Sequence, residues 1–461
     1  MYYSSTRGLE KNNSFEEVLL NGLAKDGGLY VPNRLKKFKK NEIEDFKSLD
    51  YYELAHKITF DFVKEEISDI DYLRICEKTY ESFSHDSVIS HTPLYENEAI
   101  LNLFNGPTLA FKDFALQLLG NIYEFFLEKR NSKLTIIGAT SGDTGSAAIN
   151  GCSQSDRVKM FILFPHNKVS EIQRKQMTTV KKENVFNIAI KGNFDDCQNI
   201  VKLLFERNNI EQKYNLAAVN SINWVRIMGQ IVYYFWSYIN FAVNGEKINF
   251  GVPTGNFGNV YAGYLAKQMG LPINKLVIAS NSNDVLTRFF ETGVMKKKTT
   301  VKTLSPSMDI QVSSNFERLL FDCMEKKGPK IKEFYEKLRH DGNFFINKKK
   351  LAKISNFFVA GRLSDRKTQK TIQEIYSEFG VIVDPHTAVG ICLGRELLKK
   401  NEKNVYLATA HYGKFLDTIK SSLKKDIRAP KKLDKIKKEK EEFKIMENNL
   451  DIIDQFIQQN T

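Results

Sequence analysis

Apolar and polar residues alternate regularly through the middle of the chain. Short, nearly continuous apolar runs predict strands, and apolar residues that recur every three or four positions predict helices. The expected strands are 99–104, 134–139, 159–164, 185–190, 248–253, 275–280 and 405–407, and the expected helices include 114–125, 145–150, 171–180, 195–207 and 261–269. Because strand–helix–strand units repeat and most of the strands are apolar throughout, we expect an α/β fold of parallel sheets covered by helices.

The two ends of the chain follow other patterns. Residues 1–95 are mixed and largely helical, with helices expected at 15–23 and 51–62. From about residue 431 the chain is rich in Lys and Glu, which predicts a solvated surface helix or a frayed tail.

One uncharged stretch, residues 227–245, is long enough to cross a membrane. It contains Gln230, Ser237, Asn240 and Asn244 besides three tyrosines. This composition favours a buried helix of a large domain over a membrane span.

Length and composition narrow the class of protein. The 461 residues exceed what one hydrophobic core usually organises, so several domains are expected. Hydrophobic residues make up 42% and charged residues 27%, which excludes a disordered chain, a collagen-like fibre and a disulfide-stapled miniprotein.

The net charge of +13 could indicate an anionic partner. Residues 419–444 hold 11 basic and 5 acidic residues and so supply +6 of the excess. A basic tail on a mildly basic body, without interleaved aromatic residues, does not indicate a nucleic-acid surface.

The five cysteines give no sign of a metal site or a disulfide framework. They are Cys76, Cys152, Cys197, Cys323 and Cys392, and none forms a C-x-x-C pair. The first residues lack the charged and apolar regions of a signal peptide, so we expect a cytoplasmic protein.

A candidate catalytic lysine follows the first expected strand. Lys112 lies among apolar neighbours, between 109–111 and 114–115. Burial lowers the pKa of a lysine, and a neutral amine is what Schiff-base formation requires. The alternative is a surface lysine at a helix start whose ammonium group reaches solvent past its neighbours.

Two polar loops come between expected strands and helices. Residues 138–146 are rich in Gly, Ser and Thr, and hydroxyls and backbone N–H groups at a helix start can bind an anion. In 253–259, Gly255 and Gly258 would let the backbone approach a phosphate. The alternatives are an ordinary helix cap and a plain Gly/Asn turn. Neither loop is a P-loop or a G-x-G-x-x-G motif.

A fourth segment follows the strand expected at 405–407. Thr409 could hydrogen-bond a ring nitrogen, and His411 could equally be a structural histidine. In open α/β folds, ligands bind beyond the carboxyl ends of the strands, where all four segments are expected.

The order of these segments resembles fold-type II pyridoxal-phosphate enzymes of the tryptophan-synthase-β-like group. It is most similar to the threonine synthase family, in its longer bacterial and fungal branch. The segments that carry the resemblance are 3–8, 26–30, 104–113, 140–145, 255–259, 281–289, 305–318, 384–388 and 408–411. The resemblance runs from the N-terminus to about residue 420, and the tail adds nothing to it.

The resemblance implies an activity: a lyase that converts O-phospho-L-homoserine and water to L-threonine and phosphate, the last step of threonine biosynthesis. Lys112 would hold pyridoxal 5'-phosphate as a Schiff base and move protons. The cofactor-binding residues would be Lys112, Gly255, Asn256, Phe257, Gly258, Asn259 and Thr409, with Thr409 bonded to the pyridine nitrogen. The substrate's anionic groups would bind Thr140, Ser141, Asp143 and Thr144.

Two positions depart from related sequences. Many fold-type II enzymes have Asn where this chain has Asp143, and the Asp matches the longer threonine synthase branch. Tyr412-Gly413 replaces a common Pro-Ala before Lys414, which predicts a different backbone shape near Thr409. Arg288 and Lys414 are candidates for binding the substrate's phosphate.

Four regions are expected. They are an N-terminal segment (1–95), a smaller α/β domain with Lys112 and the loop at 141–143 (96–220), a larger α/β domain with the phosphate loop (221–425) and the basic tail (426–461). We expect no metal, no nucleic acid and no membrane partner, and a monomer or homodimer.

Three other functions stay open. A related phospho-lyase would release a 2-keto acid, ammonia and phosphate, and its product distinguishes it. A non-catalytic binding relative would lack the cofactor's visible absorbance. A nucleic-acid role would depend on the basic tail. We expect deletion of residues 431–461 to leave turnover intact.

Overall fold

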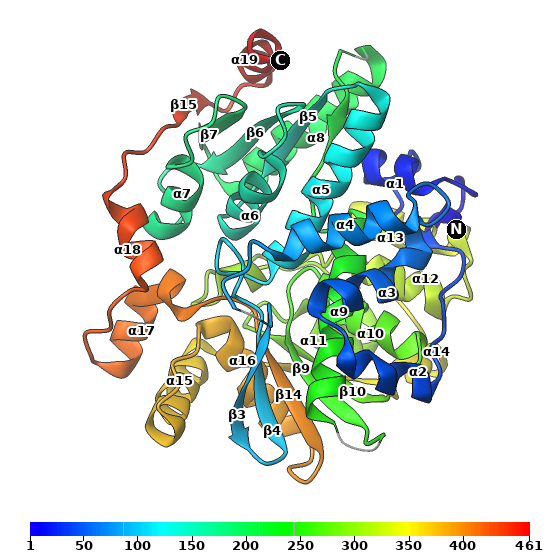
Figure 1. Ribbon diagram of the computed structural model, residues 1–461, viewed down its shortest axis with the longest axis vertical. Helices are drawn as coiled ribbons and strands as arrows, with labels where there is room; N and C mark the ends of the chain where they lie inside the picture. Colours follow the sequence, from blue (N-terminus) through cyan, green and yellow to red (C-terminus); the bar gives the residue numbers. More distant parts are fainter. Residues whose placement is uncertain (86, 212, 243–244) are drawn as a thin grey trace.

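The computed structural model describes residues 1–85, 87–211, 213–242 and 245–461. Two sheets form its framework, and Figure 1 shows them in different halves of the molecule. The expected α/β fold of open, largely parallel sheets covered by helices is confirmed.

The five-stranded sheet is parallel throughout and has the order β15-β7-β6-β5-β8. Its strands are β15 (Lys444–Glu447), β7 (Val185–Lys191), β6 (Val158–Pro165), β5 (Leu134–Ala139) and β8 (Leu216–Ala217). The helices α5 (Lys112–Arg130), α6 (Asp143–Cys152), α7 (Glu171–Thr178) and α8 (Phe194–Glu211) alternate with the strands along the chain. The predicted strand at 134–139 has the observed bounds, the strands predicted at 159–164 and 185–190 differ from β6 and β7 by one residue at one or both ends, and the helix predicted at 195–207 ends four residues before α8 does.

The six-stranded sheet has the order β13-β10-β9-β14-β4-β3. Its strands are β13 (Phe358–Arg362), β10 (Ile273–Ser280), β9 (Ile248–Pro253), β14 (Lys403–Ala408), β4 (Glu98–Asn102) and β3 (Ser90–Tyr95). The pairs are parallel except for the hairpin of β3 and β4. The antiparallel edge is an addition to the predicted parallel sheet.

Helices on and around this sheet include α9 (Trp224–Phe241), α10 (Gly258–Gln268), α11 (Val285–Thr292), α12 (Phe316–Cys323), α13 (Gly328–His340), α14 (Lys348–Ser355), α15 (Asp365–Phe379), α16 (Pro385–Leu397) and α17 (Leu416–Leu423). The short strands β11 (Val294–Lys296) and β12 (Asn343–Phe345) pair with each other. Two 3-10 turns, η2 (Pro306–Met308) and η3 (Tyr412–Phe415), lie in loops.

The N-terminal region is mixed and mostly helical, as expected. It contains β1 (Tyr3–Ser5), α1 (Phe15–Asn21), β2 (Tyr30–Pro32), α2 (Lys40–Asp45), η1 (Phe46–Ser48), α3 (Tyr51–Val63) and α4 (Asp69–Tyr80). Buried aromatic side chains join this region to the body; the Tyr3 and Phe62 rings both lie against Trp224 of α9.

The uncharged stretch at 227–245 falls largely in α9, most of whose residues are buried. Residues 243 and 244 of the predicted range lie outside the described residues. Within the described ranges, no helix has both the length and the apolar character needed to cross a membrane.

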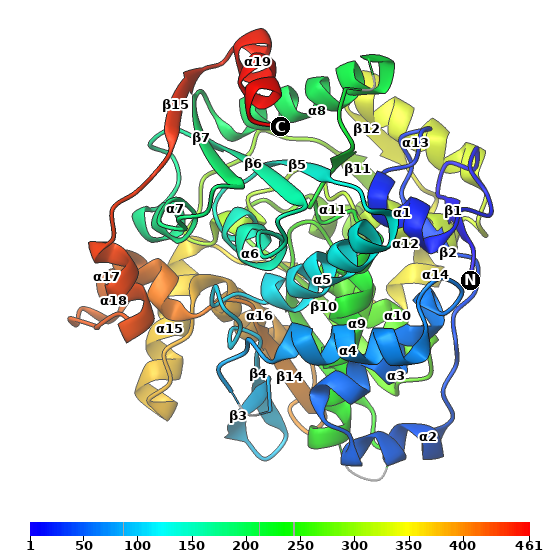
Figure 2. The same ribbon diagram turned by 45° about the horizontal axis from the view of Figure 1, so that its top comes forward.

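The prediction of a solvated surface helix is correct for α18 (Lys431–Lys438), where only Leu433 is buried, but a solvated or frayed end is wrong for the rest of the tail. After α18 (Lys431–Lys438), β15 extends the five-stranded sheet beside β7, and α19 (Leu450–Asn460) packs on α8. Ile453 and Ile457 are fully buried in the core formed by β6, β7 and α8. Figures 1 and 2 show the tail running from α17 and α18 to this sheet.

The four-region division remains a prediction, although the sheets cross its boundaries. β4, inside the region 96–220, lies in the six-stranded sheet, and β15, inside the tail, lies in the five-stranded sheet.

Candidate active site

Lys112 is the first residue of α5, and the loop before it is fixed by Asp113. The buried Asp113 carboxylate accepts hydrogen bonds from the Thr108 backbone N–H (2.8 Å) and the Thr108 hydroxyl (2.7 Å). A side chain at Gly106 would collide with Asp113, because a Cβ there would lie 2.4 Å from the Asp113 Cβ. The loop therefore gives Lys112 a defined position.

The loop before Lys112 pairs with the chain that leaves β14. Phe111 N–H donates to the Thr409 carbonyl (2.9 Å), His411 N–H donates to the Leu109 carbonyl (3.1 Å), and Ala110 and Ala410 form an isolated β-bridge. The structure thus brings Thr409 and Lys112, far apart in sequence, to neighbouring loops. Thr409 is 7% exposed.

Lys112 belongs to a buried charged cluster. Its Nζ lies 3.4 Å from Asp143 Oδ2, and Lys414 Nζ lies 2.7 Å from Asp143 Oδ1. Gln173 Nε2 of α7 also donates to Asp143 Oδ1 (2.9 Å), and Lys414 donates to the Thr108 carbonyl (2.9 Å). The Asp143 carboxylate therefore joins two lysines that lie far apart in the sequence.

The electrostatics of the cluster fit an amine that must lose a proton. Burial lowers the pKa of Lys112, and the positive charges of Lys414 and Arg226 lower it further, while Asp143 opposes them. Burial alone would raise the pKa of Asp143, but Lys414 and Lys112 hold it below its usual value, so the carboxylate stays ionised. The alternative of a solvent-reaching surface lysine is not supported, because only 12% of the Lys112 side chain is exposed.

The predicted substrate residues divide between structural and accessible positions. The Thr140 hydroxyl accepts hydrogen bonds from the N–H groups of Gly142 and Gly145, each at 2.9 Å, and so shapes its own loop. Ser141 is exposed and Thr144 is partly exposed, both at the start of α6. Substrate binding by these residues remains a prediction.

The loop 255–259 joins β9 to α10 through a tight turn. Phe257 has a left-handed backbone (φ 63°) and is 1% exposed, and its ring packs edge-on against Phe316. A Cβ at Gly255 would lie 2.7 Å from the Ser307 carbonyl oxygen. The glycine keeps a tight turn in front of the first N–H groups of α10, which favour an anion.

Asn259 gives this loop an unpaired donor. Its Oδ1 accepts hydrogen bonds from the hydroxyls of Tyr233 (2.6 Å) and Tyr234 (2.8 Å), while its Nδ2 is buried and has no hydrogen-bond partner among the described residues. A buried amide donor is normally paired. A bound phosphate would accept from it, so the residues present fit the phosphate of pyridoxal phosphate.

His411 has a structural role. Its Nδ1 accepts a hydrogen bond from the Gly413 N–H (3.0 Å) and so caps η3, and its ring lies edge-on to Phe104. Burial lowers the pKa of His411 to about 4, so the imidazole is neutral at neutral pH.

The two candidates for the substrate's phosphate are already paired. Arg288 donates to Asp284 Oδ1 (2.8 Å) and to the Lys296 carbonyl (3.0 Å), and Lys414 is bound to Asp143. Sequence reasoning did not predict the Lys414–Asp143 pair or the part of Gln173. One signal was available: Lys414 is retained although Tyr412-Gly413 replaces the common Pro-Ala before it.

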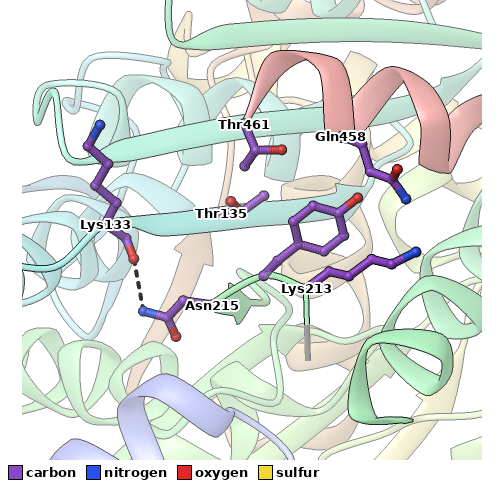
Figure 3. Close-up of a pocket in the computed structure, with 7 residues that line it drawn as sticks. Lys133, Thr135, Lys213, Asn215, Gln458 and Thr461 are labelled. Carbon is purple, nitrogen blue, oxygen red and sulfur yellow. Dashed lines mark hydrogen bonds between the residues drawn. The ribbon is translucent and has the colours of Figure 1, made fainter. Parts of the chain in front are cut away.

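A surface pocket lies elsewhere, at the edge of the five-stranded sheet (Figure 3). Its volume is about 500 Å³, and it is lined by Lys133, Thr135, Lys213, Tyr214, Asn215, Gln458 and Thr461. Asn215 Nδ2 donates to the Lys133 carbonyl there (2.9 Å). None of the predicted site residues lines this pocket. In the part of the chain that the structure describes, no group of three His, Cys, Asp or Glu side chains is placed to hold a metal ion.

Three family models match the chain. They are described as threonine synthase N terminus (residues 2–80), pyridoxal-phosphate dependent enzyme (residues 101–336) and threonine synthase, C-terminal (residues 387–457). The last match corrects the expectation that the resemblance ends near residue 420, since it includes the tail.

Similar proteins and structures cover the whole chain. A threonine synthase of Pseudomonas aeruginosa is 46% identical over 100% of this chain and 98% of the relative, and that of Saccharomyces cerevisiae is 41% identical over 96% and 95%. A crystal structure titled as pyridoxal-phosphate-bound threonine synthase from Brucella melitensis has a TM-score of 0.96 at 42% identity and covers 100% of this chain and 99% of the other.

Proposed function

The chain belongs to the threonine synthase family of pyridoxal-phosphate enzymes, and from that premise we propose how its own residues convert O-phospho-L-homoserine and water to L-threonine and phosphate. The observation that carries the proposal is the buried cluster of Lys112, Asp143 and Lys414. In this cluster the Lys112 amine, whose pKa is lowered, lies beside the Asp143 carboxylate, which stays ionised. The cluster adjoins the loop that contains Thr409 and the loop that precedes α6.

The cofactor is held at three places. Lys112 Nζ would be its covalent anchor, the loop 255–259 would bind its phosphate, and the Thr409 hydroxyl would hydrogen-bond its pyridine nitrogen. When bound, pyridoxal phosphate stores the electron pair left on carbon after a proton is removed. A hydroxyl partner at that nitrogen leaves the nitrogen neutral, unlike a carboxylate partner.

Lys112 moves the protons of the reaction. As a free amine, its Nζ would take protons from the substrate Cα and Cβ as phosphate leaves from Cγ, and it would return protons to Cγ and, when the hydroxyl of water adds at Cβ, to Cα. A lowered pKa increases the fraction of neutral amine available as a base. Asp143, held ionised by Lys414, stabilises the ammonium form between the transfers.

The start of α6 binds the substrate. The Ser141 and Thr144 hydroxyls and the first N–H groups of the helix bind an anionic group of the substrate, and Thr140 holds the loop in shape. Asp143 lies in the same turn, but Lys112 and Lys414 balance its charge. An anionic substrate is also favoured by the chain's net charge of +13.

An absorbance spectrum followed by borohydride reduction and peptide mapping tests the anchor. We expect a visible band and an adduct on Lys112. An adduct on another lysine would contradict the assignment. Product analysis then separates the reactions: threonine is expected, whereas 2-oxobutyrate with ammonia would indicate the phospho-lyase.

We also propose a cytoplasmic monomer or homodimer that binds no nucleic acid. Free cysteines support a reducing compartment, and the tail packs on the chain itself, where the Lys437 carbonyl accepts a hydrogen bond from Lys175 and the Glu441 carboxylate accepts one from Arg174 of α7. Sedimentation at several protein concentrations tests the oligomeric state. A salt-dependent increase in the sedimentation coefficient on addition of RNA would contradict the proposal that the protein binds no nucleic acid.

A further inference from the structure

Gln173 is a buried side chain that binds the Asp143 carboxylate and has no role in the chemistry described so far. It lies in the first turn of α7 and is 4% exposed. Its Nε2 donates to Asp143 Oδ1 (2.9 Å), and its Oε1 accepts a hydrogen bond from the Ser170 hydroxyl (2.7 Å). Because Ser170 binds the amide oxygen, the amide nitrogen is the atom that is turned toward Asp143.

The loop before α6 is fitted around Gln173. Gly142 has a positive backbone angle (φ 137°), which favours glycine, and a Cβ there would lie 2.8 Å from Gln173 Cδ and 2.9 Å from Gln173 Cβ. A larger residue at position 142 would push the amide away. The glycine next to Asp143 is therefore required by the contact between Gln173 and Asp143.

Gln173 and Lys414 bind the same oxygen of Asp143. Lys414 Nζ lies 2.7 Å from Oδ1 and Gln173 Nε2 lies 2.9 Å from it, whereas Lys112 Nζ lies 3.4 Å from Oδ2. Charge-assisted N–H···O bonds are about 2.7–2.9 Å long, so Lys112 has the weakest contact of the three. Two donors on Oδ1 restrict rotation of the carboxylate and keep Oδ2 at this longer distance from Lys112.

This distance affects the protonation of Lys112. Burial lowers the pKa of Lys112, and Asp143 of α6 opposes that effect. Lys414 of η3 and Arg226 of α9 add to it. Asp113, the next residue of α5, directs its carboxylate to the loop before the helix. An Asp143 oxygen closer to Lys112 would stabilise the ammonium form and leave less neutral amine at neutral pH.

The tail holds the helix that carries Gln173. Arg174, the next residue of α7, donates two hydrogen bonds to the Glu441 carboxylate (2.8 and 3.1 Å), a geometry that fixes both partners. The Thr178 hydroxyl donates to Glu441 Oε1 (2.8 Å), and the Glu442 N–H donates to the Thr178 carbonyl (2.6 Å). Glu441 therefore binds α7 at two points along its length.

The tail also packs on the segments that precede both lysines of the cluster. Leu433 of α18 is fully buried in a group that includes Leu109 of the lysine loop. A Cβ at Gly413 would lie 2.5 Å from Pro430 Cδ and 3.0 Å from Leu433 Cδ1. The residue before Lys414 is thus a glycine at the place where the tail packs against it. These contacts make the tail a support for the buried charged cluster.

We propose that Gln173 is a positioning residue for the proton transfers of Lys112, and that Glu441 of the tail holds Gln173 in place through α7. Gln173 acts through Asp143: it keeps the carboxylate ionised and turned so that it does not form a short ion pair with Lys112. The inference rests on the proposed role of Lys112 as proton carrier and gives the tail a part in that role.

The first test measures the apparent pKa of Lys112 in the full-length protein without cofactor. Reductive methylation with formaldehyde and cyanoborohydride at several pH values, followed by peptide mass mapping, reports the fraction of neutral Lys112. Gln173→Met removes the donor and keeps a side chain of similar size. We expect the apparent pKa of Lys112 to rise by about one pH unit, because Asp143 is then free to form a full charge-assisted bond.

The second test follows threonine formation by the cofactor-loaded enzyme over the same pH range. In Gln173→Met, kcat should fall about 10-fold at neutral pH and approach the wild-type value at high pH, with KM nearly unchanged. Glu441→Ala should shift both readouts in the same direction by a smaller amount, because α7 keeps its other contacts. Glu441→Gln, which keeps acceptors for Arg174 and Thr178, should lie closer to wild type.

Asp454→Ala is the matched control. Asp454 lies in α19 of the same tail, and its carboxylate also accepts from an arginine and a hydroxyl, Arg207 (2.9 Å) and Tyr214 (3.0 Å). These partners carry no residue of the cluster. The control should lower thermal stability and leave the titration of Lys112 and the pH dependence of kcat as in wild type.

Three outcomes would overturn the inference in whole or in part. An unchanged or lower pKa of Lys112 in Gln173→Met would refute the role of Gln173. If Glu441→Ala resembled the Asp454 control, with lower stability but no shift, the tail would have only a structural role. Trapping of the cofactor on a lysine other than Lys112 in wild type would instead refute the proposed function.

Discussion

The two sides of the active site satisfy their charges differently. On the lysine side, Asp143 pairs with Lys112 and Lys414 and accepts from Gln173. On the phosphate side, at the loop 255–259, Asn259 Nδ2 is buried without a hydrogen-bond partner among the described residues. The charges of the lysine side are paired within the chain, whereas the phosphate side keeps a buried donor that a bound phosphate would accept from.

This difference separates two tasks. A cluster that balances its own charges can hold protons in defined places whether or not a ligand is present. Unpaired donors instead convert their unfavourable burial into binding affinity when a phosphate arrives. Variants on the lysine side should therefore change turnover, and variants on the phosphate side should change affinity.

The largest effect is expected from Lys112→Ala. The substitution removes both the covalent anchor and the proton carrier, so turnover should fall by more than about 10³-fold. Threonine formation and the loss of the visible band measure it. Lys129→Ala, on an exposed position of the same helix, is the control and should retain wild-type activity. Wild-type turnover by Lys112→Ala would refute the central assignment.

Deletion of residues 431–461 should also cause a large loss. The expectation from sequence was that turnover would survive, but Leu433 is fully buried against Leu109 of the lysine loop and Ile172, and β15 and α19 complete the five-stranded sheet. Each buried Leu or Ile that is removed costs roughly 2–5 kcal/mol. Thermal unfolding and turnover test this.

A charge variant separates packing from electrostatics in the tail. Lys435→Gln with Lys438→Gln changes only exposed positions and should leave stability and turnover near wild type. An equal loss of stability and turnover in this variant and in the deletion would contradict a packing role for α18.

Lys414→Met should give an intermediate effect. Breaking a buried pair costs roughly 3–5 kcal/mol, and Asp143 would become easier to protonate. The folded-state pKa of Asp143 is depressed in wild type, so its contribution to stability is present above about pH 4, the ordinary pKa of Asp, and is lost as the pH falls toward the folded-state value.

The measurement is unfolding at several pH values between 3 and 8. We expect the free energy of unfolding of wild type to exceed that of Lys414→Met most at neutral pH, and the difference to narrow in acid. Turnover of the variant should also fall. A gap that does not depend on pH would show that Lys414 acts through packing alone.

The smallest effect is expected from Thr409→Ala. One neutral hydrogen bond contributes about 0.5–1.5 kcal/mol, so cofactor affinity or turnover should fall about 2- to 10-fold. Thr409→Ser keeps the hydroxyl and should retain most of the activity, whereas Thr409→Val should resemble the Ala variant. Indistinguishable Ser and Val variants would contradict a role for the hydroxyl.

Much of the fold could be predicted because its signals are local. β5 and β9 have the bounds that their apolar runs predict, and the helices between the strands begin within a few residues of the expected positions. β15 gave no such signal, because only two of the four residues in Lys-Ile-Met-Glu are apolar and most of the strand is exposed; it is a strand because it pairs with β7. For α19, the spacing of Leu450, Ile453, Phe456 and Ile457 was an available signal.

The sequence by itself determined which residues can do the chemistry: a lysine among apolar neighbours after a strand, and two Gly-rich loops at helix starts. These properties depend on adjacent residues and on backbone conformation. Only the tertiary structure decided how the charges pair. Lys414 meets Asp143, and Asn259 Nδ2 is left without a hydrogen-bond partner in the part of the chain that the structure describes, because burial and the distances between polar groups are set by chain segments that are remote in sequence.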